Sequence, residues 1–108
     1  MANTFKNSFS KNVGTAAATI YTAPALTQTT LIGLSVANTT ASPITCDAYV
    51  TSSAVDYYLI KGATVPVGGS LVIVGGDQKV VLEAADALKV ISSAASSADV
   101  VCSLLEIT

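Results

Sequence analysis

The sequence predicts an all-β fold: a single antiparallel β-sandwich, jelly-roll or Ig-like, of about eight short strands with an extended N-terminal arm. First, the apolar share of 51 % is mostly Ala, Val, Leu and Ile, with only 6 % aromatic residues, and branched side chains favour strands. Second, apolar runs of strand length recur roughly every 8–12 residues, between breaks rich in Gly, Pro, Asn and Asp. Third, no stretch long enough for a helix shows helical periodicity. A chain of 108 residues forms one domain.

The arm is expected at residues 1–15 and the sandwich at residues 16–108. The first segment is rich in Asn and Ser, which favour loose or extended chain. It also holds both phenylalanines, Phe5 and Phe9, beside Lys6 and Lys11. Either these rings anchor the arm in a pocket of the same subunit or a neighbour, or they cap one end of the core.

The first three strands of the sandwich are expected at Ala17–Thr22, Thr30–Asn38 and Ile44–Thr51. The first ends at Pro24, because proline cannot donate to the ladder. The other two alternate between apolar and polar residues, which is typical of half-buried antiparallel strands. Turn-forming residues at Asn38–Pro43 join them, so the two are expected to form a hairpin.

The stretch Tyr57–Ser92 behaves differently, because its apolar runs do not alternate. Strands are expected at Tyr57–Ile60, Leu71–Val74, Val80–Leu82 and Leu88–Ser92, and a last one at Val100–Ile107. A strand that is apolar on both faces is buried on both. We therefore expect this stretch to form the face that the protein hides, with its outer side covered by the arm, by another copy or by a larger surface. The side chains expected at this interface are Phe5, Lys6, Phe9, Lys11, Tyr49, Tyr57, Tyr58, Val72, Val81, Val101 and Leu105.

Charge is scarce. Five Lys face seven Asp plus Glu, and charged residues make up 11 %, well below the ~25 % of ordinary soluble domains. Without Arg, and with few Lys, the chain is not expected to bind nucleic acid. Wide uncharged surface is expected in a subunit that packs against neighbours, so we predict a stable homo-oligomer.

No enzymatic, metal or cofactor site is predicted. The chain has no His, the usual general base, and its carboxylates are spread over turns and strand edges. Cys46 and Cys102 are too far apart in the sequence for a zinc motif; they are expected to be buried free thiols, with an inter-sheet bridge as the alternative. The segment Gly75-Gly76-Asp77-Gln78 is expected to be a hairpin turn, since it lacks both calcium-loop and P-loop signatures.

Neither a membrane span nor a secretory signal is recognisable, so we expect an intracellular origin without membrane contact. Carbohydrate binding is the binding-module alternative, since Tyr21, Tyr49, Tyr57 and Tyr58 could present aromatic faces. Neighbouring strand residues point to opposite faces. Only one of Tyr57 and Tyr58 could therefore share a platform with Tyr49, and ordinary strand packing explains these residues equally well.

The order of several short motifs resembles that of small tailed-bacteriophage virion proteins. The motifs are TIYTAP (Thr19–Pro24), ANTT (Ala37–Thr40), YYLIKG (Tyr57–Gly62), VPVGGSL (Val65–Leu71), VLEAADALKV (Val81–Val90) and LEI (Leu105–Ile107). The resemblance implies a non-enzymatic β-sandwich subunit of the virion, assembled in the host cytoplasm as a trimer or dimer. Such a subunit would be a capsid decoration (cement) protein on the major capsid protein, or a tail- or baseplate-associated module that binds host-surface glycans. The absence of a long repetitive shaft favours the decoration role.

Overall fold

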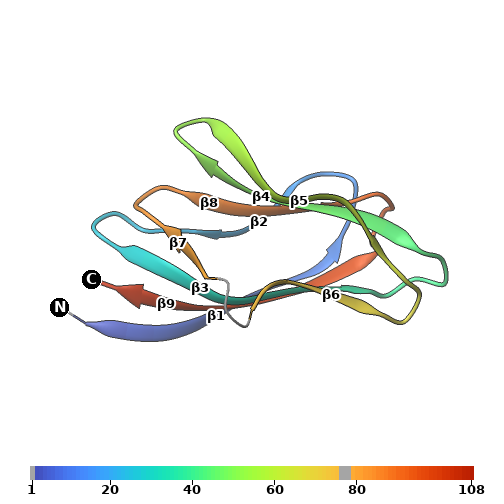
Figure 1. The fold of residues 1–108 in the computed structure, drawn as a ribbon, viewed down its shortest axis with the longest axis horizontal. Coiled ribbons are helices and arrows are strands. Elements are labelled where there is room, and N and C mark those ends of the chain that lie inside the picture. The colour runs from blue at the N-terminus through green and yellow to red at the C-terminus, as the bar shows by residue number, and fades with distance from the viewer. Residues whose placement is uncertain (1, 76–78) are drawn as a thin grey trace.

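Over residues 2–75 and 79–108, which the computed structural model describes, the chain folds into two antiparallel sheets packed as a sandwich. Nine strands lie within these residues: β1 (Asn3–Val13), β2 (Ala18–Thr22), β3 (Gln28–Asn38), β4 (Ile44–Ser52), β5 (Val55–Val65), β6 (Ser70–Val74), β7 (Val80–Leu82), β8 (Ala87–Ser92) and β9 (Ala98–Ile107). Figure 1 shows the two layers, with both ends of the chain together at one end of the sandwich. No helix in the described part of the chain is long and apolar enough to cross a membrane.

One sheet, which we call sheet A, has the strand order β1-β9-β3-β6, with β7 also paired to β3. The other, sheet B, has the order β2-β8-β4-β5. Strands β6 and β7 lie one after the other along the same edge of β3, since β6 pairs with Leu34–Ala37 and β7 with Thr29–Leu31. Apart from the neighbours β4–β5 and β6–β7, every consecutive pair of strands changes sheet. This alternation is that of a jelly roll, so the predicted all-β sandwich is confirmed.

The core lies between the sheets and is built from the alternate residues that point inward. Sheet A supplies branched aliphatic side chains from β3 and from β9, and sheet B supplies them mainly from β8 and β4. The largest fully buried side chains include Leu31, Leu34, Val36, Leu88, Val90, Val100 and Leu104. Burying so many branched aliphatic groups is the main favourable term for this fold.

The turns follow local backbone chemistry. Gly69 N–H donates to the carbonyl of Pro66 over 3.0 Å, and Gly68 between them has φ of +69°, as a type II turn requires. The β4–β5 turn instead places Ser53 and Ala54 at φ of 51° and 63°, which Gly and Asn adopt far more readily. Of the turn expected at Gly75-Gly76-Asp77-Gln78, residues 76–78 lie outside the described residues.

Three expectations differ from the structure. The predicted arm is not separate: residues 3–13 form β1, which pairs with β9 from Asn3↔Ile107 to Val13↔Ala98. Backbone hydrogen bonds to β9 hold this edge strand in place. Its side chains are mostly polar and exposed, so the sequence shows no strand pattern there. The predicted hairpin is also wrong, because β3 and β4 lie in different sheets.

The turn between β3 and β4 carries the chain from one layer to the other. Asn38 fixes it by donating its side-chain amide to the carbonyls of Ser42 and Val65, at 2.8 and 3.1 Å. Finally, the stretch Tyr57–Ser92 does not form one face. Its strands β5 and β8 belong to sheet B, while β6 and β7 belong to sheet A.

Candidate functional site

The most distinctive surface is the outward side of sheet A, which we call the outer face. Residues directly opposite one another in neighbouring strands point to the same side of a sheet. Phe5 of β1 is opposite Leu105 of β9, and Phe9 is opposite Val101. Across β3, Val72 of β6 and Val81 of β7 point to this same side. The register therefore gathers six of the predicted interface residues on one face: Phe5, Phe9, Val72, Val81, Val101 and Leu105.

Five of these six side chains are open to solvent, and Leu105 is half-buried. The exposed fractions are 76 % for Phe5, 64 % for Phe9, 67 % for Val72, 62 % for Val81 and 47 % for Val101. Single exposed apolar residues are ordinary, but a contiguous apolar patch on a small protein marks an interaction site. The outer face carries such residues on β1, β9, β6 and β7, on both sides of the central strand β3.

Charge is scarce on the described strands of the outer face. Among its strand residues, only Lys11 and Asp99 are ionisable, and both lie at one end. There Lys11 Nζ lies 3.2 Å from Asp99 Oδ2, and Asn12 N–H donates to the other carboxylate oxygen over 3.1 Å. These interactions, the Asn12 hydrogen bond foremost, lower the pKa of Asp99. The other outward residues of these described strands have apolar, hydroxyl or amide side chains, or none in the case of glycine.

Two hollows interrupt the outer face, one beside the phenylalanine edge and one further across the sheet. One, of about 350 Å³, is lined by Phe5, Ile32 and Ser103 among others. The second, of about 270 Å³, lies between Val101 and Val72 and includes Gly33. The hollows exist because β3 and β9 carry small residues at their centre, namely Gly33, Ser35 and Ser103. The surface thus combines a raised aromatic edge with a depressed middle.

Lys6, which the sequence predicts as an interface residue, is paired within the fold, with its side chain 51 % exposed. Its Nζ lies 3.0 Å from Glu106 Oε1, on the inward side of sheet A. Glu106 also accepts a hydrogen bond from the Tyr21 hydroxyl of sheet B, 2.5 Å away. Tyr21 is in turn 2.8 Å from the buried Thr29 hydroxyl. Lys6 therefore belongs to a polar cluster that links the two sheets, which we call the polar tether. Its members are Lys6, Tyr21, Thr29 and Glu106.

The hydrogen bonds of this polar tether shift the pKa values of Glu106 and Tyr21. Hydrogen bonds from Tyr21 and then Lys6 lower the pKa of Glu106, because both stabilise its charged form. Burial, followed by the hydrogen bond to Glu106, raises the pKa of Tyr21 to about 12. Sequence reasoning did not find this cluster, since its members come from four different strands.

The tyrosines of sheet B do not make an open aromatic platform. Tyr49 is only 8 % exposed, because Tyr58 lies over it with ring centroids 4.9 Å apart. Lys61 Nζ lies 4.7 Å from the Tyr58 ring centroid and occupies part of its face. Tyr57 is 59 % exposed but is opposite Val50, one position along the ladder from the Tyr49–Tyr58 pair. Tyr49 is thus wrongly placed among exposed binding residues.

Both cysteines point into the core. Cys46 of β4 and Cys102 of β9 are free and have exposed fractions of 1 % and 0 %. Burial raises the pKa of Cys46 and raises that of Cys102 to about 11, because the charged thiolate is poorly solvated there. These thiols behave as small buried hydrophobes.

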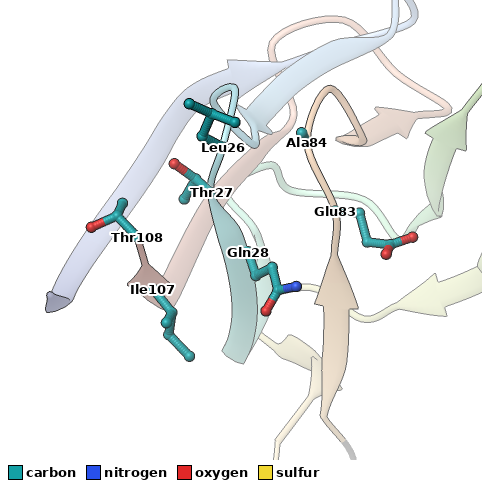
Figure 2. A pocket seen from close by; sticks show the side chains of 7 residues that line it. All are labelled: Leu26, Thr27, Gln28, Glu83, Ala84, Ile107 and Thr108. Carbon is teal, nitrogen blue, oxygen red and sulfur yellow. The ribbon is translucent and has the colours of Figure 1, made fainter. Parts of the chain in front are cut away.

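A depression larger than these two hollows lies elsewhere, at the end of the sandwich where the chain termini meet (Figure 1). It has a volume of about 670 Å³ and is lined by Leu26, Thr27, Gln28, Glu83, Ala84, Ile107 and Thr108. Figure 2 shows these side chains around an open cleft between the β2–β3 loop, the segment after β7 and the end of β9. Glu83 is its one ionisable lining side chain, so no acid–base pair is present there. In the described residues, no group of three potential ligands could hold a metal ion.

Comparison with known proteins supports the fold class. No protein-family model matches the chain, and no curated protein matches it. Among solved structures, the chain is similar to one from work titled "Bacillus endospore appendages form a novel family of disulfide-linked pili". The likeness has a TM-score of 0.51 at 14 % identity and covers 98 % of this chain and 88 % of the other. At this identity the two share a fold.

Proposed function

We propose that this chain is a non-enzymatic structural subunit of a tailed-phage virion, most specifically a decoration protein that binds and stabilises the capsid shell as a multimer. The observation that carries the proposal is the outer face of sheet A, with Phe5, Phe9, Val72, Val81 and Val101 exposed and little charge on its described strands. A surface of this kind is costly to leave in water and is stabilised when copies assemble.

Two further observations support a structural role. The charged share is 11 %, which suits a protein that spends its working life packed against others. The motif order also resembles small virion proteins, for which assembly in the host cytoplasm and a place on the particle are implied. The partners would then be other copies of the chain and the major capsid protein.

Two other assembled roles follow from specific observations. Tyr57 and Tyr58 remain 59 % and 46 % exposed, so a tail- or baseplate-associated module that binds glycans is the second candidate. A glycan-array signal that Tyr57→Ala abolishes would favour that role. The similar solved structure comes from work on pili, so a filament of repeated copies is the third candidate.

Immunogold electron microscopy distinguishes these roles. An antibody raised against the chain is applied to particles purified from lysates of the phage that encodes it. Decoration predicts label distributed over the shells, in many copies per particle. Label confined to tails would favour the glycan-binding role, and labelled filaments the third. Particles that carry no label anywhere would refute a virion role.

A further inference from the structure

We infer that the outer face of sheet A binds a second copy of this chain, face to face, about a two-fold axis that runs close to β9. The inference deepens the proposed function, because it rests on the chain acting as a multimeric subunit and names the partner of its apolar face. Three properties of the face carry it: its shape, its strand order and its charge.

The shape of the outer face is self-complementary. Phe5 and Phe9 project from β1 at one edge, with 76 % and 64 % of their surface exposed. The hollow of about 270 Å³ lies two strands away, over Gly33 of β3. Its lining includes the small residues Gly33, Ser35 and Ser103, which leave room for a ring from outside. A second copy supplies such a ring from Phe9, which lies level along the sheet with Val101 and Ser35 of this hollow.

The strand order fixes where the axis must lie. In sheet A, β9 stands between β1 and β3. A half-turn about an axis parallel to β9 places β1 of one copy over β3 of the other, and the reverse. Phe9 of each copy then lies over the partner's hollow, and the two contacts are identical, as an isologous interface requires. Ser103 lines both hollows, so the centre of the pair lies over this residue.

Charge and area are both consistent with a second copy. Two identical charged faces would repel one another, but the ionisable strand residues of this face are Lys11 and Asp99, paired at one end. An overlap of three strands is ~14 Å wide and ~33 Å long for ten residues. Such an overlap buries roughly 1,000 Å² when both copies are counted, the lower limit for a specific interface. The association is therefore expected to be specific but readily reversible.

The chain's own N-terminal segment does not compete for this face. Residues 3–13 form β1 itself and cannot fold back over the sheet to which they belong. Among the outward strand positions, the tallest side chains are those of β1, and they point away from the molecule. An external partner of matching shape is needed to bury them.

Site-directed cross-linking tests the pair. Ser103→Cys places a thiol at the proposed axis, where it faces its own counterpart across two packed sheets ~10 Å apart. A bis-maleimide of matching length should shift nearly all of the purified protein from the monomer to the dimer band. The native thiols do not interfere, because Cys46 and Cys102 are 1 % and 0 % exposed.

Thr64→Cys is the matched control, since Thr64 is exposed on the outward side of sheet B, opposite Thr45. It should stay at the monomer band under the same conditions. Ser103→Cys that remains monomeric, or Thr64→Cys that cross-links equally, would overturn the inference. A cross-linked pair in a protein that labels no particle would refute the virion role alone. Labelled particles together with unlinked Ser103→Cys would refute the two-fold pair alone.

Discussion

Replacing Phe5 with serine separates association from folding. Phe5 is 76 % exposed in the single subunit, and a phenylalanine presents about 200 Å², so ~150 Å² of ring is free to be covered by a partner. At ~25 cal/mol per Å² the burial contributes up to ~4 kcal/mol from each copy. Two-fold symmetry applies the loss twice. If half of the surface is covered, Phe5→Ser weakens the pair by ~4 kcal/mol, about a thousandfold in dissociation constant.

Folding should suffer far less from the same change. Only 24 % of Phe5 is covered within the subunit, as the complement of its 76 % exposure. That area corresponds to ~1 kcal/mol of unfolding free energy, a decrease of roughly 4–8 °C in melting temperature for a domain of this size. The predicted signature is a large loss of association with a small loss of stability.

Sedimentation velocity over a dilution series measures the association, and thermal unfolding at low concentration measures the stability. Tyr57→Ser is the control, because Tyr57 is 59 % exposed but belongs to sheet B. It should leave the dissociation constant unchanged. If Phe5→Ser and Tyr57→Ser alter association equally, or if neither does, the reasoning about the outer face is refuted.

Three other outcomes follow from the fold. Tyr21→Phe removes the hydroxyl that donates to Glu106 and should lower the melting temperature at neutral pH. The pKa of Glu106 is lowered in the folded state. Its contribution to folding stability is therefore fully present above its ordinary pKa of ~4.3 and is lost as the pH falls through its folded-state pKa. The difference in melting temperature between Tyr21→Phe and the parent should then become smaller in acid. A difference that does not change with pH would contradict a stabilising role for ionised Glu106. Cys46 and Cys102, both buried, should react with a thiol reagent only after unfolding, and rapid labelling of native protein would disprove their burial. Gly68→Ala, at φ of +69°, should cost about 1 kcal/mol in denaturant unfolding, whereas an unchanged midpoint would show that the turn relaxes.

The fold class was predictable because its signals are local. Period-2 alternation in β3 and β4, and the Gly68-Gly69 turn, each report on a few neighbouring residues. Which strands share a sheet was not predictable in the same way. Alternation tells which side chains point inward, and β3 and β4 both point into the same core from opposite layers. A short connection between them was therefore compatible with a hairpin inside one sheet and with a passage from one sheet to the other.

The edge strand β1 and the β4–β5 turn could not be predicted from the sequence either. β1 is held by its ladder with β9, so its Asn and Ser residues gave the composition of a loose arm. The β4–β5 turn is formed by Ser53 and Ala54, both at positive φ. Neither residue is a Gly or Asn, so the sequence does not indicate a turn at this position. In each case tertiary pairing overrides local preference.

The candidate site was predicted in part. The apolar residues of the outer face, such as Val101 and Val72, were recognisable because they broke alternation in otherwise buried strands. The burial of Tyr49 and the ion pair of Lys6 were not predicted, since both depend on neighbours distant in sequence. Tyr58 covers Tyr49, and Glu106 engages Lys6. The hollow at Gly33 depends on three strands and has no signature in any one of them.

The mass of the unmodified chain in solution tests the central claim most directly, with Gly33→Leu measured beside it. A Cβ at Gly33 would meet only the Val74 carbonyl oxygen, at 3.8 Å, so the fold accommodates the substitution while the leucine fills the hollow. Sedimentation equilibrium should give a species of twice 10.8 kDa for the parent at high concentration. Gly33→Leu should give the single-chain mass, with an unchanged circular dichroism spectrum. A parent that stays monomeric at every concentration, or a variant that dimerises as well as the parent, would contradict a pair built on the outer face of sheet A.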